Sequence, residues 1–142
     1  RDGLVTGVQT CALPIWLLAK PGSKLYSPLA ILAVQYGRGE KVFSVPASAY
    51  MPQPHVESCV VTLTPAASQP PMNWPRYQRF LETCFAQRRK TLLNNLRTVG
   101  LTIEQMQDVR RFLADRGLAE SVRAEAVGAI DFAALFQICS TT

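Results

Sequence analysis

The spacing of hydrophobic positions changes near the middle of the chain. Upstream, residues 41–45 and 56–63 are rich in Val, Phe and Thr and are bounded by proline, which predicts two strands. Ser27 and Pro28 fit the N-cap and first position of a helix that ends at Gly37, although periodicity alone also allows a buried strand there. Downstream, apolar residues recur at helical spacing. The pattern therefore predicts an α+β part followed by an all-helical part.

A proline-rich stretch without periodicity, residues 66–75, separates the two parts and is expected to be a linker. After it, residues 76–97 place apolar side chains on one face and predict one long amphipathic helix. The apolar positions of that face are Tyr77, Phe80, Leu81, Cys84, Phe85, Leu92 and Leu96.

Two further helices are expected near the C-terminus. Thr102 and Gln105 have the spacing of a capping box, and the apolar stripe after them ends at Gly117. A third, short helix is expected over residues 132–138, beginning near Gly128 or Asp131. The stripe of the second helix consists of Ile103, Met106, Val109, Phe112 and Leu113.

The composition is that of a globular protein with an anionic partner. The 142 residues are 48% hydrophobic and 18% charged, and 15 Lys and Arg against 10 Asp and Glu give a net charge of +5. Nucleic acid is the first candidate partner. Residues 76–97 alone hold six basic residues and one acid, Glu82, although such a run can equally be the solvated face of a helix. The basic residues are Arg76, Arg79, Arg88, Arg89, Lys90 and Arg97.

Several kinds of site are not predicted. The four cysteines are widely spaced and have only His55 as a nitrogen companion, so neither a metal site nor a disulfide framework is expected, and free thiols favour a cytoplasmic location. The longest apolar run, residues 29–34, is too short for a membrane span of about 20 residues. The Gly37-Arg38-Gly39 cluster lacks the third glycine of a nucleotide-binding loop, and no catalytic residue is predicted.

Residues 1–15 stand apart from the rest. Residues 5–15, VTGVQTCALPI, resemble the frame translation of a common sequencing-library adapter, against the alternative of an ordinary strand and turn. We therefore expect residues 1–15 to be an adapter-derived tail that makes few specific contacts with the remainder.

Residues 45–58, VPASAYMPQPHVES, resemble the FxPxPxVxS motif of the rRNA adenine N6-methyltransferases, with Tyr50 where that family usually has Phe. The resemblance implies an adenine pocket formed by Tyr50, Pro52 and Pro54. An amino group inside a duplex cannot be reached, so the base must leave the stack and lie against an aromatic face, in a loop that prolines keep rigid. The alternative is that Tyr50 packs beneath a proline-rich turn.

Two later segments, FAQRRKTLLNNL at residues 85–96 and VRAE at residues 122–125, resemble the C-terminal helical domain of the small-subunit rRNA adenine N6,N6-dimethyltransferases, the KsgA (RsmA) family. LAKPGSKLY at residues 18–26 resembles the same family, so the likeness covers residues 16–138. It implies that residues 16–65 are the last strands of a Rossmann-like methyltransferase sheet and that residues 76–142 are a helical rRNA-binding domain.

The resemblance also implies a function. Members of the family transfer methyl groups from S-adenosylmethionine to two adjacent adenines near the 3′ end of 16S rRNA, and the intact protein is expected to be a monomer that contacts RNA through Arg88, Arg89, Lys90 and Arg97. The glycine-rich loop and the Asn-Leu-Pro-Tyr motif of the family are absent from these 142 residues. The chain is therefore expected to be a C-terminal fragment that binds no cofactor by itself. The alternative is a non-catalytic RNA-binding module for ribosome assembly.

Overall fold

A computed structural model describes residues 4–10, 17, 19–53, 58–66 and 73–140 of the chain. The chain divides into two compact units. The first comprises Arg1–Lys20 and Leu25–Pro71, and the second comprises Pro21–Lys24 and Met72–Thr142. A short upstream segment thus belongs to the second unit, which the sequence did not indicate.

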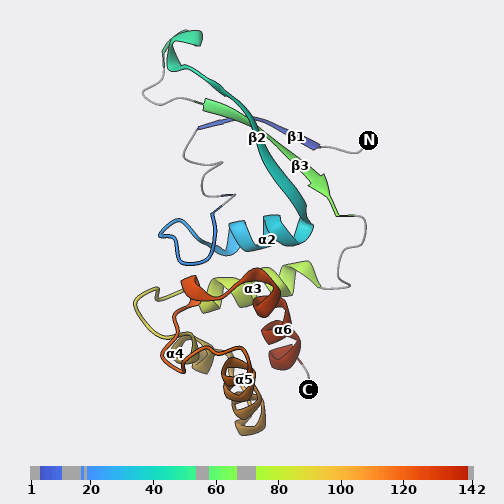
Figure 1. Ribbon diagram of the computed structural model, residues 1–142, viewed down its shortest axis with the longest axis vertical. Helices are drawn as coiled ribbons and strands as arrows, with labels where there is room; N and C mark the ends of the chain where they lie inside the picture. Colours follow the sequence, from blue (N-terminus) through green and yellow to red (C-terminus); the bar gives the residue numbers. More distant parts are fainter. Residues whose placement is uncertain (1–3, 11–16, 18, 54–57, 67–72, 141–142) are drawn as a thin grey trace. The chain divides into compact units, whose positions relative to one another are not determined.

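The first unit is built on a three-stranded antiparallel sheet with the strand order β1-β3-β2 (Figure 1). β2 spans Gly37–Val45 and pairs with β3, which spans Ser58–Pro65, in a register that sets Gly37 opposite Pro65 and Val45 opposite Ser58. Both predicted strands exist; β2 begins four residues earlier than expected, and the predicted start of the other strand, residues 56 and 57, lies outside the described residues.

Helix α2, Pro28–Tyr36, precedes β2 directly. The side chain of Ser27 accepts a hydrogen bond from the amide of Ala30, and Pro28 occupies the first turn, as predicted. Gly37 ends the helix, but in extended rather than left-handed backbone. Glycine is required there by space, because a β-carbon would overlap the carbonyl oxygen of Thr64 on the paired strand.

Strand β1, Leu4–Thr10, corrects the expectation that residues 1–15 make few contacts. It pairs antiparallel with β3, with Leu4 opposite Leu63 and Thr10 opposite Ser58, so β3 has a neighbour on each side. Strand pairing uses backbone N–H and C=O groups that every residue except proline carries, and it needs little side-chain complementarity. The adapter origin of the segment stays a prediction.

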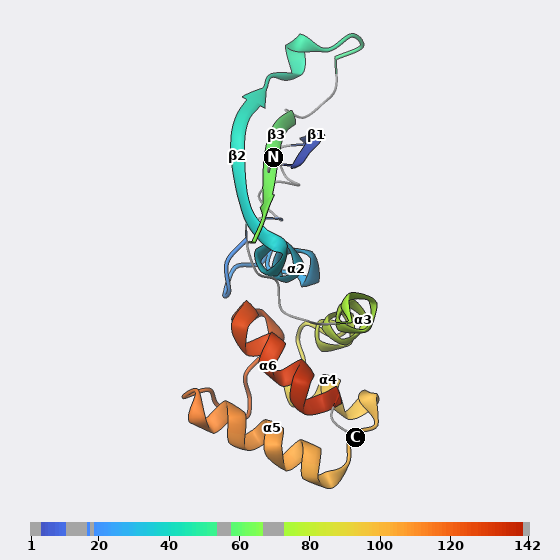
Figure 2. The same cartoon turned by 90° about the vertical axis from the view of Figure 1, so that its right-hand side faces the viewer.

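The second unit contains four α-helices among its described residues: α3 Trp74–Cys84, α4 Leu92–Leu96, α5 Ile103–Asp115 and α6 Ala129–Ser140. Short 3₁₀ turns, η2 at Arg97–Val99 and η3 at Ala124–Ala126, connect them. Figure 2 shows α6 lying between α3 and α5. The helix expected near the C-terminus begins at Ala129, within the range predicted.

The single long helix expected over residues 76–97 is wrong. α3 ends at Cys84, and α4 begins only at Leu92, where the side chain of Thr91 accepts a hydrogen bond from the amide of Asn94 and caps the new helix. The start of α3 also falls inside the expected linker, because Asn73 caps the helix and Pro75 stands in its first turn.

Helix α5 begins and ends as its sequence predicts. The hydroxyl of Thr102 accepts from the amide of Gln105, and the side-chain oxygen of Gln105 accepts from the amide of Thr102, which is a complete capping box. At the other end, Gly117 has a φ of +72°, and the amides of Gly117 and Leu118 donate to Ala114 and Leu113, as in a Schellman motif. One position of the expected stripe is wrong, because Ile103 is 80% exposed.

Aromatic side chains from α3 and α6 form the centre of the helical unit. The rings of Tyr77 and Phe80 lie 5.1 and 5.4 Å from that of Phe136, and Phe85 lies 5.6 Å from Phe132. Each such pair of rings contributes about 0.5–1.5 kcal/mol beyond its hydrophobic burial. These ring contacts join α3 to α6 within the core of the helical unit.

Candidate nucleic-acid interface

The segment between α3 and α4 is a fixed turn rather than a continuation of either helix. Asn95 is 5% exposed, and its side chain accepts a hydrogen bond from the amide of Gln87 at 3.2 Å and donates to the carbonyl of the same residue at 3.1 Å. A weaker contact runs from its amide group to the carbonyl of Thr91 at 3.4 Å. A buried side chain of α4 therefore holds the first part of the turn that carries Arg88, Arg89 and Lys90.

The sequence segments that carry the family resemblance meet at this turn. The amide of Leu92 donates to the carbonyl of Val122 at 2.8 Å, and the amide of Gly22 donates to the carbonyl of Glu125 at 2.6 Å. The guanidinium of Arg88 lies 3.7 Å from the carboxylate of Glu125. Hydrogen bonds near η3 thus join residues that lie about 30 and about 100 positions apart in the sequence.

The three basic residues of the turn differ in what they contact. Arg88 pairs with Glu125, and its guanidinium carbon lies 5.2 Å from the centroid of the Phe85 ring, so its side chain is only 39% exposed. Arg89 and Lys90 are exposed, and neither forms an ion pair with a described residue. The turn therefore exposes two cations without an ion-pair partner among the described residues, Arg89 and Lys90, next to Arg88, which links the turn to η3.

The remaining basic residues of the predicted run lie on other elements. Arg97 is exposed in η2, whereas Arg76 and Arg79 lie on α3 and help to line a pocket of about 210 Å³. The sequence did not indicate this pocket, because its walls come from α3, η2 and α6. Its other lining residues are Phe80, Thr83, Val99, Phe136, Cys139 and Ser140. The six cations expected on one helix are therefore divided among α3, the turn and η2.

The loop expected to hold the adenine belongs to the first unit. After β2, a 3₁₀ turn η1 at Ala47–Ala49 leads to Tyr50, whose amide donates to the carbonyl of Ala47 at 3.2 Å. The Tyr50 side chain is half-buried, and its hydroxyl has no hydrogen-bond partner among the described residues. Pro52 is exposed and follows a cis peptide bond, and Pro54 and His55 lie outside the described residues.

The two cysteines of the helical unit are free thiols rather than ligands. Burial raises the pKa of Cys84 far above its ordinary value, with a further increase from the neighbouring Cys139, and burial raises the pKa of Cys139 to about 12. Within the described ranges, no group of three or more His, Cys, Asp or Glu side chains is placed to hold a metal ion. Nor does any helix in those ranges combine the length and hydrophobicity that a membrane span requires.

Comparisons with known proteins agree with the resemblance of the motifs. A family model described as ribosomal RNA adenine dimethylase matches residues 14–139. The ribosomal RNA small subunit methyltransferase A of Lactobacillus delbrueckii subsp. bulgaricus is 38% identical over 122 residues, which cover 85% of this chain and 40% of that protein. The protein of the same name from Geobacillus thermodenitrificans is 39% identical over 123 residues, with 84% and 42% covered.

Solved structures share the fold. A dimethyladenosine transferase from Plasmodium falciparum superposes with a TM-score of 0.75 at 20% identity, covering 96% of this chain and 56% of that one. The 23S rRNA methyltransferase ErmE superposes with a TM-score of 0.66 at 17% identity, covering 99% and 55%. The chain spans about two fifths of the length of the curated relatives it matches. Because the family model matches nearly the whole chain, the chain belongs to the ribosomal RNA adenine dimethylase family.

Proposed function

We propose that the protein to which this chain belongs transfers methyl groups from S-adenosylmethionine to two adjacent adenines near the 3′ end of 16S rRNA, and that this chain supplies RNA binding and one wall of the adenine pocket. Family membership and the names of the relatives support the reaction. The observation that carries the part played by this chain is the turn at residues 88–90, where Arg89 and Lys90 are exposed and have no acidic partner among the described residues.

Arg89 and Lys90 are suited to phosphate contact for a physical reason. An exposed cation without an acidic partner can release counterions from the RNA backbone at no internal cost, whereas a cation already paired must first give up that pair. Arg88 holds the turn on Glu125 and adds positive potential, and Arg97 extends the basic surface beyond α4. The turn thus gives affinity that does not depend on base sequence.

Tyr50 is proposed to receive the extruded adenine. Tyr50 directly follows η1, whose backbone hydrogen bonds fix the start of the loop, and its half-buried side chain ends in a buried hydroxyl. Stacking on an aromatic face needs no particular base edge, so this residue would hold the base, and recognition of the amino group would fall to other residues of the complete protein.

The described residues do not fit a site for S-adenosylmethionine. The one glycine cluster, at Gly37 and Gly39, lies within β2, and Gly37 packs against the carbonyl of Thr64 instead of opening a loop toward a helix N-terminus. The gene sequence preceding residue 16 tests the enzymatic part, because a reading frame without G-x-G-x-G and Asn-Leu-Pro-Tyr would favour the non-catalytic assembly module.

The RNA-binding part is tested by salt dependence. For binding to a 16S rRNA 3′-end helix, the double substitution Arg89→Ala/Lys90→Ala should flatten the plot of log K against log salt by about 0.7–0.9 for each phosphate that these side chains no longer neutralise. The matched control is Arg110→Ala/Arg111→Ala, which removes the same charge from two α5 residues that already pair with Glu120 and Asp108. An equal change of slope in both variants would mean that net charge alone, and not the turn, binds RNA.

A further inference from the structure

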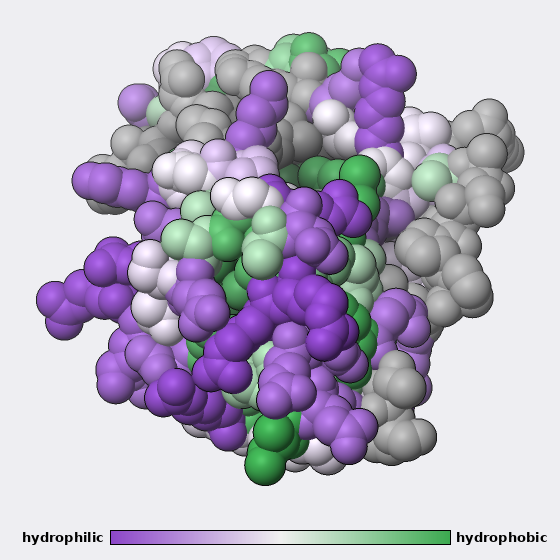
Figure 3. Space-filling model, turned by 60° about the horizontal axis from the view of Figure 1, so that its bottom comes forward, coloured by the Kyte–Doolittle hydropathy of each residue, from purple (hydrophilic) through white to green (hydrophobic). Residues whose placement is uncertain are grey.

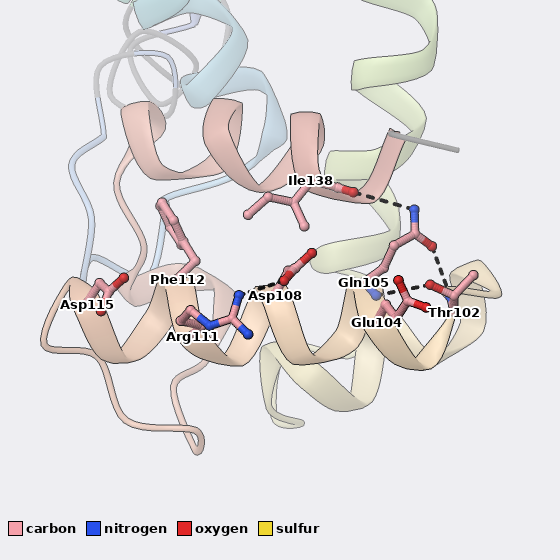
Figure 4. A pocket seen from close by; sticks show the side chains of 8 residues that line it. All are labelled: Thr102, Glu104, Gln105, Asp108, Arg111, Phe112, Asp115 and Ile138. Carbon is pink, nitrogen blue, oxygen red and sulfur yellow. Dashed lines mark hydrogen bonds and ion pairs between the residues drawn. The ribbon is translucent and has the colours of Figure 1, made fainter.

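A groove between α5 and α6 has a chemical character opposite to that of the basic turn. Its volume is about 790 Å³. Figure 4 shows Phe112 rising from α5 toward α6 and Ile138 descending from α6 toward α5, with charged side chains along α5 below them. The groove lies wholly within the helical unit, and it is lined by Thr102, Glu104, Gln105, Asp108, Arg111, Phe112, Asp115 and Ile138.

The charged lining of the groove is acidic. Asp108 is already neutralised by Arg111 on the same helix, 2.8 Å away. Glu104 and Asp115, one near each end of α5, are exposed and have no ion pair with a described residue. The lining therefore carries three acids and one base in a chain whose net charge is +5. A phosphate backbone would be repelled here, whereas a cationic ligand would be attracted.

Hydrophobic surface lies between the two unpaired carboxylates. The side chains of Phe112 and Ile138 are partly exposed in the groove. Figure 3 shows a face of the molecule where hydrophobic side chains emerge in narrow strips between hydrophilic ones. An apolar floor between two anionic ends suits an amphipathic ligand with cations at its ends.

The spacing of the two carboxylates sets the length of that ligand. Glu104 and Asp115 are 11 residues apart on one helix, which places them roughly 16 Å apart along its axis. An extended peptide covers this span with about five to six residues.

From these observations we infer that the α5–α6 groove binds an extended basic segment of a partner protein, with two Lys or Arg side chains an even number of residues apart, about six, so that both face the groove and pair with Glu104 and Asp115. Apolar side chains between them contact Phe112 and Ile138. The inference is independent of the proposed methyl transfer, because it rests only on the shape and charge of this groove.

A synthetic peptide tests the inference directly. The probe is a fluorescein-labelled peptide containing Lys-Ser-Leu-Ser-Leu-Ser-Lys, which places both Lys and both Leu on one face of the extended chain, and its affinity for the full 142-residue chain is measured by fluorescence anisotropy at low salt. Glu104→Gln/Asp115→Asn should weaken binding on the order of tenfold, since both end contacts become neutral. The matched control, Glu82→Gln/Glu120→Gln, removes the same charge from exposed residues outside the groove and should bind as the unaltered chain does.

Three outcomes would overturn the inference. A peptide with Glu in place of both Lys could bind equally well, which would mean that the carboxylates do not select the ligand. The control double variant could lose as much affinity as the groove variant, which would reduce the effect to net charge. Sedimentation could reveal that the chain associates with itself through the groove and that the association is abolished in Glu104→Gln/Asp115→Asn, in which case the occupant is a second copy.

Discussion

Replacing Asn95 with Ala tests whether this buried amide holds the basic turn in place. The side chain makes two hydrogen bonds to Gln87, at 3.2 and 3.1 Å, and a longer one to Thr91 at 3.4 Å. A typical intramolecular hydrogen bond contributes about 1 kcal/mol net, and leaving a partly buried partner unsatisfied costs about 1–3 kcal/mol. We therefore expect Asn95→Ala to lower the free energy of unfolding by roughly 2–3 kcal/mol.

Urea denaturation followed by far-ultraviolet circular dichroism measures this decrease. With a slope of about 1–3 kcal/mol per molar urea, the midpoint should fall by about 1 M or more. The matched control is Asn94→Ala, an exposed neighbour on α4 whose side chain makes no hydrogen bond to a described residue, and its stability should change by no more than about 0.5 kcal/mol. If both variants unfold at the same urea concentration, Asn95 does not hold the turn.

Three further outcomes are expected. In the complete protein, Tyr50→Phe should retain activity because it keeps the ring and removes a hydroxyl without a described partner, whereas Tyr50→Ala should lose about 1–3 kcal/mol of stacking with the extruded base, measured as kcat/KM. Burial raises the pKa of Cys139 from 9.0 to about 12 in the folded chain, so the neutral thiol stabilises the fold fully below pH 9 and this stabilisation is lost as the pH rises toward 12. In thermal melts, Cys139→Ser should therefore lose less stability between pH 9 and 12 than the unaltered chain does. Calorimetric titration of this chain with S-adenosylmethionine should detect no saturable micromolar binding, and such binding would reveal a cofactor site within these 142 residues.

Local sequence signals predicted where helices begin, but they did not predict the break between α3 and α4, which depends on tertiary contacts. Ser27 with Pro28, and Thr102 with Gln105, mark helix starts through contacts within four residues, so the sequence contains all the information needed. The break within residues 76–97 was missed because the apolar spacing continues through it. It is set by Asn95 bonding to Gln87, eight residues away, and the one local sign was Thr91 as a possible N-cap.

The candidate sites show the same division. The motif residues could be identified from the sequence, but their contact in space could not be predicted. That contact depends on hydrogen bonds of Leu92 with Val122 and of Gly22 with Glu125, which join segments far apart in the sequence. The α5–α6 groove was missed because the charges along α5 resemble any solvated helix face until Ile138 of another helix is placed opposite them. For residues 4–10 a strand was the alternative weighed against a tail with few contacts, and β1 pairs with β3 through backbone groups that every residue except proline carries.

The amide of Gln105 joins the beginning of one helix to the end of another. Its oxygen accepts from the amide of Thr102 at the start of α5, while its nitrogen lies 3.3 Å from the carbonyl of Cys139 and 3.5 Å from that of Ile138 in the last turn of α6. One side chain thus bonds a backbone N–H at the start of α5 and backbone carbonyls at the end of α6, groups that have no partner within their own helices. Fraying of either end removes the cap of the other, so these two termini should open as a single cooperative unit in amide hydrogen exchange. A glutamate at this position would keep the first bond and turn the second into repulsion between oxygens, uncoupling the two helices without altering either one's own sequence preference.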